Sequence, residues 1–492
     1  MQSTGSVLQK GIEDIHISKH DEVYLKINCE PSVAQEICDY FTFFVPGYTF
    51  MPAYRNKIWD GKIRLFNIHS RYLYSGLLEY VFIFAKKRNY KVIPDGDWWK
   101  PLKIEHNQEF IDHLNLPFVP RDYQLDAFHH ALSYQKTLLV SPTASGKSLI
   151  IYLIVRALNV KTLIIVPTTS LVSQLYADFQ QYGWDSLKYC HQVYAGQDKV
   201  SNKKVVISTW QSIYKLGRKL FEPYELVIGD EAHGFKSKSL TSIMTKCVNA
   251  KYRIGTTGTL DGTQTHKLVL EGLFGKVYKA TTTKELIDKK ELASFSIKIL
   301  LLKYPNDICV SMRNSKYMDE IEFLVGHEKR NKYIKNLVLS LKGNTLLLFR
   351  LVKKHGRILY DMIKEVSDES NRTTFFVHGG TETETRERIR AIAEEEHDAI
   401  IVASYGVFST GINIRNLHNI VFASPSKSRI RNLQSIGRGL RLSENKNETV
   451  LYDIADDLRT GARKNFAYQH LEERIKIYDD ESFTYTVHKL DL

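Results

Sequence analysis

A short glycine-containing segment, SPTASGKS at residues 141–148, carries the side chains that proteins use to hold a nucleoside triphosphate. It lies between two apolar stretches, which is the strand–loop–helix order that a phosphate-binding loop requires. Backbone N–H groups at the start of a helix bind phosphate oxygens, aided by the helix dipole. The Lys147 ammonium would reach the β- and γ-phosphates, and the Ser148 hydroxyl would ligate Mg²⁺. The other loop residues expected to contact the nucleotide are Thr143, Ala144, Ser145 and Gly146.

A pair of carboxylates, Asp230 and Glu231 at the end of the apolar run 225–229, supplies a second chemical signal. A carboxylate in that position can hold Mg²⁺ through water, and its neighbour can polarise the attacking water. One acidic residue after a strand is common, and the loop alone departs from the usual pattern because Ser141 replaces its first glycine. The loop and the ordered carboxylate pair together specify hydrolysis of a nucleoside triphosphate.

Two arginines in QSIGRGLR, residues 434–441, have the chemistry of a third component. Phosphoryl transfer places negative charge on the γ-phosphate oxygens, and a guanidinium from a facing domain can raise the rate by about 10³- to 10⁵-fold. Arg438 and Arg441 are spaced so that a helix would carry both on one face. Gln434 is expected to join the same catalytic group. An isolated Arg-x-x-Arg pair is more often a solvated surface, so this assignment depends on its context.

Two series of short apolar runs predict the elements that position these groups. The runs alternate with helical segments, a pattern typical of parallel sheets covered by helices. The first series is 136–140, 162–166, 204–208, 225–229 and 252–256, and the second is 296–302, 344–349, 373–377, 398–403, 418–423 and 449–454. We therefore predict an α/β protein with two tandem α/β domains after a small α+β domain. The predicted domains are 1–112, 113–288, 289–462 and a helical C-terminal tail, 463–492.

The composition favours a polyanionic partner, with a basic solvated surface as the alternative. The chain of 492 residues has 68 basic and 55 acidic residues, a formal net charge of +13, and 43% hydrophobic residues. Its five cysteines are scattered, without the short paired spacing of a zinc or redox site. No apolar run approaches the ~18 residues of a membrane span, and the first residues lack a signal-peptide pattern. We expect a cytoplasmic monomer without membrane contact, in the host cytoplasm if a phage encodes it.

Eight ordered sequence blocks resemble the motifs of superfamily-two helicases. They are RDYQLDA, SPTASGKS, IIVPTTSLVSQ, STWQS, DEAH, GTTGTL, ASYGVFSTGINI and QSIGRGLR, within residues 121–441. Inside that superfamily the chain is similar to the UvsW-type helicases of tailed phages, and the similarity extends to YRNKIWDGKIRLF. This resemblance implies two RecA-like domains preceded by a small N-terminal DNA-binding domain. It also implies ATP and Mg²⁺ as cofactors and DNA as the partner.

The resemblance assigns roles to individual residues. Gln124 would read the adenine base, the pair Asp230 and Glu231 would serve Mg²⁺ and water, and the arginines of QSIGRGLR would complete the site. The residues that would link hydrolysis to strand movement are His233, Thr257, Gly258 and Thr259. The residues that would serve both nucleotide and nucleic acid are Thr410, Gly411 and Asn413. Aspartate is the commoner residue where Asn413 stands.

Polar residues after the predicted strands are candidates for gripping a DNA strand. Hydroxyl, amide and backbone N–H groups at strand ends suit phosphate oxygens, which give grip without sequence choice. In the first α/β domain these residues are Pro167, Thr168, Thr169, Gln174, Thr209 and Gln211. In the second α/β domain they are Arg350, His378 and Thr410. Helix capping is the alternative role for such side chains.

The segment MPAYRNKIWDGKIRLFN, residues 51–67, combines cations and aromatic residues around Asp60-Gly61. An Asp-Gly pair between alternating residues predicts a two-residue hairpin turn. One face of that hairpin would carry Arg55, Lys57, Trp59, Lys62, Arg64 and Phe66, and the other Ile58, Ile63 and Leu65. Cations interleaved with aromatic rings suit phosphates and exposed bases. The alternative is that Trp59 and Phe66 are buried and the cations only cover them.

These observations predict an ATP-dependent DNA helicase or translocase that remodels forked and junction DNA in recombination, repair or replication restart. Three alternatives stay open. One is the motor of a restriction or nuclease system, although little chain follows residue 441. A second is an ATP-gated clamp or protein-stripping translocase that does not unwind its nucleic acid. A third is an RNA helicase, because DEAH also occurs in that group.

Overall fold

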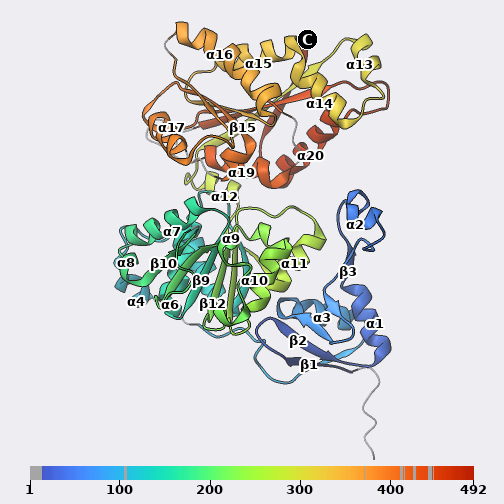
Figure 1. Ribbon diagram of the computed structural model, residues 1–492, viewed down its shortest axis with the longest axis vertical. Coiled ribbons are helices and arrows are strands. Elements are labelled where there is room, and N and C mark those ends of the chain that lie inside the picture. The colour runs from blue at the N-terminus through green and yellow to red at the C-terminus, as the bar shows by residue number, and fades with distance from the viewer. Residues whose placement is uncertain are drawn as a thin grey trace, which may run out of the picture. The chain divides into compact units, whose positions relative to one another are not determined.

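The computed structural model describes residues 14–104, 108–194, 196–370, 372–410, 414, 416–424, 428–440, 446 and 448–492. The chain forms two compact units, one ending at Ala280 and the other running from Thr281 to Leu492, with residues 142–145 counted in the second (Figure 1). Helix α12 (Thr283–Asp288), which the predicted boundary at 288–289 places in the first α/β domain, belongs to the second unit. None of the helices in these ranges has the length and apolarity that crossing a membrane requires.

A seven-stranded parallel sheet forms the centre of the first α/β domain. Its strand order is β10-β11-β9-β12-β13-β8-β14. The strands are β8 (Lys136–Val140), β9 (Thr162–Val166), β10 (Cys190–Val193), β11 (Val205–Thr209), β12 (Leu226–Asp230), β13 (Tyr252–Thr257) and β14 (Val277–Lys279). Because all of these strands run in the same direction, their carboxyl ends meet at one edge of the sheet.

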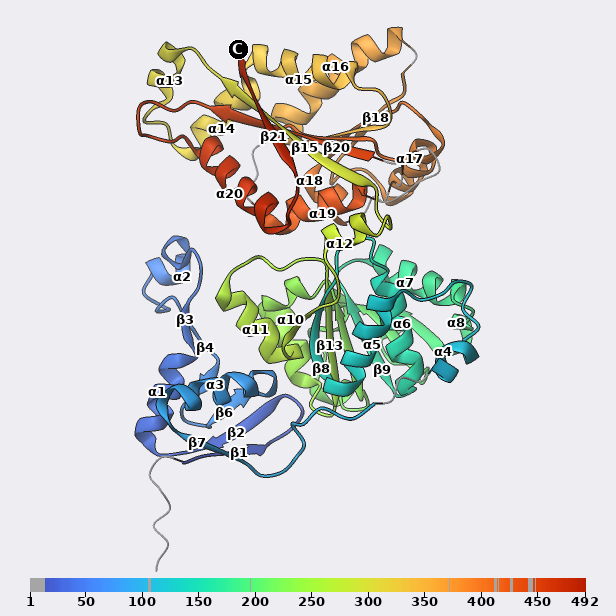
Figure 2. The same ribbon diagram turned by 180° about the vertical axis from the view of Figure 1, so that it is seen from behind.

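Helices cover both faces of this sheet (Figure 2). On one face Ile164 of β9 shares a core cluster with residues of α5 (Asp122–Tyr134), α6 (Lys147–Leu158) and α7 (Thr169–Gln181). On the other face Leu163 and Ile165 share a cluster with α10 (Lys238–Lys246) and α11 (Gln264–Phe274). Burial on both faces explains why the strands read as continuous apolar runs. The shorter helices are α4 (Gln108–His113), α8 (Ser186–Tyr189), α9 (Trp210–Ile213), η3 (Arg218–Leu220) and η4 (Ala232–Lys236).

The second α/β domain is built on another seven-stranded parallel sheet. Its order is β17-β18-β16-β19-β20-β15-β21. The strands are β15 (Ser294–Lys303), β16 (Thr345–Phe349), β17 (Thr374–Val377), β18 (Ile400–Ser404), β19 (Asn419–Phe422), β20 (Glu448–Asp457) and β21 (Tyr485–Asp491). The helices are α13 (Asn306–Met312), α14 (Tyr317–Gly326), α15 (Glu328–Ser340), α16 (Arg357–Glu369), α17 (Thr383–Glu395), α18 (Tyr405–Thr410), α19 (Arg429–Gly439), α20 (Phe466–Asp480) and the π-helical turn η5 (Val352–Gly356).

The predicted fold class is confirmed, because every apolar run predicted as a strand forms one of these parallel strands. Two strands that the pattern misses, β10 and β14, are short. A third missed strand, β21, is largely exposed and has no continuous apolar run. It pairs with β15 from Ile297↔Tyr485 to Lys303↔Asp491. The predicted helical tail 463–492 is therefore wrong in its last part, where the chain returns to the sheet.

The N-terminal module, residues 14–104, is an α+β fold. Its sheet has the strand order β5-β6-β2-β1-β7. The strands are β1 (Asp14–Lys19), β2 (Tyr24–Asn28), β5 (Phe66–Asn67), β6 (Tyr72–Tyr74) and β7 (Lys91–Pro94), and the helices are α1 (Pro31–Tyr40), α3 (Leu78–Arg88) and the turn η2 (Ser75–Leu77). Ile15 and Ile17 alternate with less buried residues along β1 and pack in the core. One core cluster contains residues of this module and of the first α/β domain, so the two pack together.

The segment predicted as a hairpin around Asp60-Gly61 has a different structure. β3 (Thr42–Phe44) pairs antiparallel with β4 (Lys62–Arg64), and the connection between them holds η1 (Tyr48–Phe50) and α2 (Pro52–Arg55). Residues 42–64 are termed the arm. Gly61 is required there because its φ is +79° and an added Cβ would lie 2.4 Å from the Tyr48 ring. The Asp-Gly signal therefore marks a close contact with Tyr48, not a two-residue turn.

The two predicted faces of that hairpin are also wrong. Phe66, predicted beside the cations, is only 1% exposed and packs in the core of the module, as does Leu65. Ile58, predicted on the packed face, is 79% exposed. The alternative of burial is correct for Phe66, which cannot offer its ring to a base. Trp59 is half-buried, and its Nε1–H donates to the Lys62 carbonyl oxygen at 2.9 Å.

A buried ion pair stabilises the core of the second α/β domain. Arg330 donates from Nε to Asp456 Oδ1 at 2.7 Å and from Nη2 to Asp456 Oδ2 at 3.0 Å, and both side chains are fully buried. The Tyr304 hydroxyl also donates to Asp456 Oδ1, at 2.8 Å. Because the pair is removed from water, loss of one partner leaves a buried charge without its counter-ion.

We predict that Asp456→Ala lowers the free energy of unfolding by about 3–5 kcal/mol, because Arg330 then stays buried and uncompensated. Urea denaturation measures the change. The control is Asp361→Ala, which removes an exposed ion pair with Arg357 in the same unit. That control should change the free energy of unfolding by at most about 1 kcal/mol. Equal effects of the two substitutions would contradict the stabilising role of the buried pair.

Candidate active site

The segment 141–148 has the strand–loop–helix arrangement that the sequence predicts. It connects β8 to α6, which begins at Lys147. Gly146 at the N-cap has a left-handed backbone with φ 76° and ψ 39°, and a Cβ there would lie 2.4 Å from Gln124 Nε2. Both the backbone and the available space therefore require glycine. Lys147 Nζ donates to the Ser141 carbonyl oxygen at 3.2 Å, so the ammonium folds back toward the end of β8.

Gln124 lies beside this glycine on α5. Its Oε1 accepts a hydrogen bond from the Arg121 backbone N–H at 2.9 Å, as part of a capping box, and the residue is 4% exposed. The amide is thus held in one orientation next to the phosphate-binding loop. Recognition of adenine by Gln124 stays a prediction that this orientation favours.

Asp230 is the last residue of β12, and its carboxylate is buried beside Thr256 of the neighbouring strand. The Thr256 hydroxyl donates to Asp230 Oδ1 at 2.8 Å, in agreement with the register Asp230↔Thr256. Burial and then the Glu231 charge raise the pKa of Asp230, whereas the Lys147 charge opposes that shift. The three groups therefore influence one another electrostatically, although they come from separate sequence motifs.

Glu231 has a backbone conformation that non-glycine residues seldom adopt. Its φ is 50° and its ψ is 49°, in the left-handed region. Such strain is found most often at functional sites, where the surrounding structure holds it. The turn directs the chain from β12 into η4, and it leaves the Glu231 side chain only half-buried. A half-buried carboxylate at this edge can still reach water.

Ser148 and Asp230 have the chemistry of a Mg²⁺ site. A divalent cation would offset the cost of burying the Asp230 charge, which is the physical fit between this residue and the ion. The Ser148 hydroxyl lies 2.8 Å from the Tyr182 hydroxyl, which orients it. Within the part of the chain that the structure describes, no group of three or more His, Cys, Asp or Glu residues could hold a metal. The remaining ligands here would be phosphate oxygens and water, as Mg²⁺ prefers.

A chain of contacts runs from the carboxylate pair to the TTGT block at the end of β13. His233 Nδ1 lies 3.3 Å from Glu231 Oε2 and 3.1 Å from Thr257 Oγ1. The Thr257 hydroxyl in turn donates to the Thr259 carbonyl oxygen at 3.0 Å, across Gly258. The predicted coupling residues are therefore adjacent in the structure. Their role in strand movement stays a prediction.

The candidate DNA contacts of the first α/β domain divide into two groups. Thr168 caps α7, because its Oγ1 accepts from the Leu171 N–H at 3.4 Å. Thr209 is 6% exposed, and its hydroxyl lies 2.8 Å from Ser212 Oγ. The capping alternative describes the contact of Thr168, whereas Thr209 stands at the N-cap of α9 without a side-chain capping bond. Among these candidates the exposed side chains are those of Thr169, Gln174 and Gln211.

Gln211 brings two of these blocks together, because its Nε2 donates to the Pro167 carbonyl oxygen at 3.2 Å. In the second α/β domain Arg350 follows β16 and is exposed, with its guanidinium 5.8 Å from the centre of the Tyr317 ring. His378 follows β17, and its Nδ1 accepts from the Gly380 N–H at 3.0 Å. All four segments thus follow the ends of strands, as predicted.

The other assigned residues of the second α/β domain stay predictions. Gln434 and Arg438 lie on α19 and Thr410 on α18, but their side chains are outside the described part of the chain. Gly411, Asn413 and Arg441 lie outside the described residues altogether. Two supporting residues in the first α/β domain, Thr256 and Tyr182, are not among the predicted site residues. Thr256 stands inside the GTTGTL block, which could have indicated it, whereas Tyr182 carries no local signal.

Three family models match the chain in the order of its domains. "DNA helicase UvsW, N-terminal" matches residues 14–95, "Type III restriction enzyme, res subunit" matches 117–262, and "Helicase conserved C-terminal domain" matches 328–443. The chain is also 33% identical to the ATP-dependent DNA helicase uvsW of Enterobacteria phage T4, over 97% of this chain and 100% of that protein. This chain belongs to the UvsW family of DNA helicases.

The chain is also similar to a second relative and to solved structures. The crystal structure of T4 UvsW has 31% sequence identity and a TM-score of 0.51, and the match covers 97% of this chain and 99% of that one. The DNA 3'-5' translocase XPB2 of Sulfurisphaera tokodaii is 29% identical over 42% of this chain and 46% of that protein. A fragment of a type I restriction enzyme HsdR subunit from Vibrio vulnificus shares the fold, with a TM-score of 0.58 at 18% identity over 79% of this chain and 72% of that one.

We predict that Asp230→Asn stops ATP hydrolysis but does not lower the thermal stability at pH 7. The raised pKa of Asp230 means that the folded protein binds this proton more tightly than the unfolded chain. The ionised carboxylate therefore costs stability above its folded pKa, and the cost disappears as the pH falls below the ordinary pKa of aspartate. Asparagine removes the charge and can still accept from Thr256.

Thermal unfolding of both proteins at pH 7 and near pH 4 checks this prediction. The midpoint of Asp230→Asn should equal or exceed that of the wild type at pH 7, and the difference should shrink near pH 4. A midpoint that falls at pH 7 while hydrolysis continues would contradict both the buried charge and the proposed role of Asp230.

Proposed function

We infer that this chain is an ATP-dependent DNA helicase. The observation that carries the inference is the convergence of Lys147, Asp230 and Glu231 at the carboxyl edge of one parallel sheet. Ligands of open α/β sheets bind at this edge. Membership of the UvsW family adds DNA as the polymer on which the energy of hydrolysis is used.

Each charged group at this edge has a defined task in our proposal. ATP with Mg²⁺ supplies the phosphoryl group and partly neutralises its charge when bound. Lys147 holds the phosphates, Ser148 and Asp230 hold the ion, and Glu231 orients the attacking water and takes its proton. The residues proposed to stabilise charge on the γ-phosphate are Gln434, Arg438 and Arg441.

We further propose that the substrate is branched DNA and that the arm contacts its duplex part. The exposed cations of the arm support this, because Arg55 ends α2 and Lys57 follows two residues later, both with exposed side chains. Arg64 pairs with Asp60 at 2.5 Å in an exposed position, where an ion pair is weak and a phosphate can compete. The Phe50 ring in the same segment is 75% exposed and suits stacking on an unpaired base where the duplex ends.

The biological setting follows from this substrate class. Remodelling forked and junction DNA is a step common to recombination, repair and replication restart, so we propose that the chain works there. Because a relative comes from a phage, we place that work in the host cytoplasm and propose that the chain acts as a monomer. The proposed contacts of the two α/β domains with a DNA strand are Thr169, Gln174, Gln211, Arg350 and His378.

Strand displacement separates this function from a clamp or a protein-stripping translocase. Wild-type protein should release the labelled strand of a forked DNA duplex with ATP and Mg²⁺. Glu231→Gln should lower hydrolysis by about 10²- to 10⁴-fold, the usual contribution of a general base, and should stop displacement while DNA binding persists. Hydrolysis without displacement by the wild type would favour the clamp, and displacement confined to RNA duplexes would favour an RNA helicase.

The arm is tested by charge reversal at Arg55→Glu together with Lys57→Glu. Each lost phosphate contact should reduce the slope of log affinity against log salt by about 0.9, so binding of forked DNA should weaken most at low salt. ATPase activity at saturating single-stranded DNA should survive, since these residues lie outside the α/β domains. Fluorescence anisotropy over a salt series measures the slope.

The matched control for the arm is Lys86→Glu with Lys87→Glu, an equal charge change on α3 of the same module. It should alter forked-DNA binding much less than the arm variant does. Equal weakening by both variants would mean that the whole charge of the module acts, without a specific contact at the arm.

A further inference from the structure

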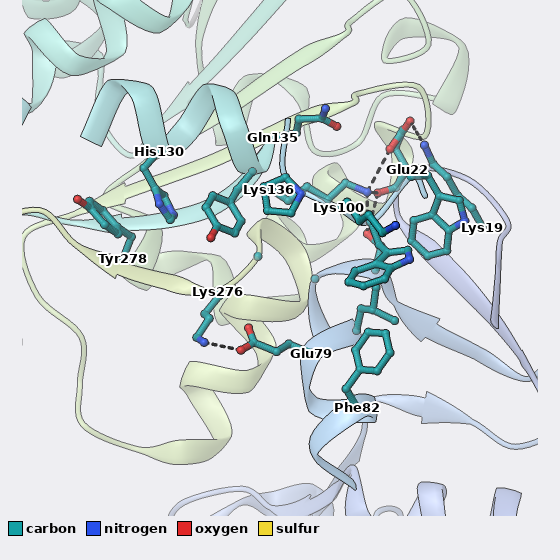
Figure 3. Close-up of a pocket in the computed structure, with 18 of the residues that line it drawn as sticks. Lys19, Glu22, Glu79, Phe82, Lys100, His130, Gln135, Lys136, Lys276 and Tyr278 are labelled. Atoms are coloured by element: carbon teal, nitrogen blue, oxygen red, sulfur yellow. Dashed lines mark hydrogen bonds and ion pairs between the residues drawn. The ribbon is translucent and has the colours of Figure 1, made fainter. Parts of the chain in front are cut away.

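A cavity of about 550 Å³ lies where the N-terminal module meets the first α/β domain (Figure 3). Both partners belong to one compact unit. Lys136, the first residue of β8, and Tyr278 of β14 line it on one side, whereas Phe82 of α3 and Trp98 line it on the other. The cavity therefore faces the amino ends of the strands. The carboxylates of the ATP site are at the opposite, carboxyl edge.

The Lys136 side chain connects the two walls of this cavity. Its Nζ donates to the Glu22 carbonyl oxygen at 2.9 Å and to Ser75 Oγ at 3.1 Å, and it pairs with Glu22 Oε2 at 3.1 Å. Nearby, the Tyr80 hydroxyl donates to Glu271 Oε2 at 2.6 Å. These bonds hold the N-terminal module against the first α/β domain. The cavity is thus formed before any ligand arrives, as small-ligand sites commonly are.

Aromatic rings stand on both walls. On the motor side His130 stacks between Tyr134 and Tyr278, with ring centres 4.3 Å and 4.0 Å apart. On the module side the Phe82 and Trp99 ring centres are 5.2 Å apart. Trp99 is 39% exposed and Tyr134 53% exposed. Exposed rings gathered at one cavity mark a binding surface more often than scattered apolar residues do.

Lysines surround these rings, and each has an acidic partner. Lys19 pairs with Glu22 at 2.5 Å, Lys276 with Glu79 at 2.5 Å and Lys100 with Asp97 at 2.7 Å. Such partly exposed pairs contribute little stability, so a phosphate oxygen can take the place of a carboxylate. Lys19 and Lys136 share Glu22, so the four lysines of the lining face three carboxylates, and this excess of positive charge favours an anion.

Burial perturbs two titratable groups of this cavity. It lowers the pKa of Lys136 to about 8, although Glu22 opposes the shift, and it lowers the pKa of His130 to about 4. A preformed cavity at a domain junction, with aromatic walls, convergent polar groups and shifted pKa values, has the properties of a ligand site.

We propose that this cavity binds a nucleotide, with the base stacked on Trp99 or Tyr134 and the phosphate on Lys100 or Lys276. Every base has a flat face that stacks on an aromatic ring, and the lysines meet the negative charge. The ligand is either a free nucleotide or an unpaired nucleotide of bound DNA. This site is separate from the ATP site, and it adds a second nucleotide-binding locus to the proposed helicase.

The experiment uses full-length protein whose ATP site is saturated with a non-hydrolysable ATP analogue and Mg²⁺. In one assay the deoxyribonucleoside monophosphate of 2-aminopurine is added. In a second assay forked DNA with one unpaired 2-aminopurine at the branch is added. Stacking on a ring quenches the fluorescence of this base. We expect the wild type to quench the fluorescence in at least one of the two assays, and the assay that responds identifies the source of the nucleotide.

Substitutions at the exposed rings locate the effect. Trp99→Ala should weaken the quenching affinity by about 5- to 100-fold, the usual effect of removing a stacking ring. Trp99→Phe keeps a ring and should lie near the wild type. Tyr134→Ala tests the other wall, and thermal unfolding verifies that each variant is folded.

Absence of quenching in both assays would overturn this proposal. Quenching that both alanine variants leave unchanged would also overturn it. Strand displacement by the wild type does not depend on either result. Failure of the nucleotide site is therefore distinguishable from failure of the helicase assignment.

Discussion

A carboxylate buried at the end of one strand is the interaction on which the candidate active site depends. Asp230 would be costly in isolation, because burial and Glu231 both disfavour its charge. Lys147 and the Thr256 hydroxyl act in the opposite direction. These groups come from β12, α6 and β13, and only a parallel sheet brings the ends of such elements to one edge. The order of the strands is thus the constraint from which the chemistry follows.

The remainder of the fold stabilises elements on which this edge relies. In the first α/β domain the fully buried Arg253 donates to the carbonyl oxygens of Met244, Cys247 and Leu273, each at 2.9 Å. These bonds fasten α10 and α11 to β13, the strand that carries Thr256. The backbone strain of Glu231 lies at the other, carboxyl edge, and such strain is found most often at functional sites.

The N-terminal module also stabilises a strand that leads to the candidate active site. Its core continues into that of the motor domain, and Lys136 spans the junction at the start of β8. The other end of β8 leads into the candidate phosphate-binding loop. A ligand held at the junction would therefore lie on the strand that positions the loop, at the far end from the nucleotide. Contacts on the module and hydrolysis in the motor share one structural element.

The parts of this molecule that sequence predicts are those with a local signal. Continuous apolar runs predict buried parallel strands, and the SGKS and DEAH blocks predict the residues at their ends. The prediction of a hairpin around Asp60-Gly61 is wrong because the glycine makes room for the Tyr48 ring. Rules for turns do not include such a contact. Burial of Phe66 and the edge strand 485–491 depend on neighbours that are distant in the chain. Tertiary packing outweighs local propensity at these positions.

Single-turnover hydrolysis of radiolabelled ATP by Lys147→Met at saturating DNA is the most direct measurement of the central interaction. Methionine preserves much of the volume of the lysine stem but removes the charge that acts on Asp230. Because Lys147 is proposed to hold the phosphates, we expect the variant to lose ATP hydrolysis while it stays folded and binds forked DNA. Hydrolysis at the wild-type rate would contradict the assignment of this edge as the catalytic site.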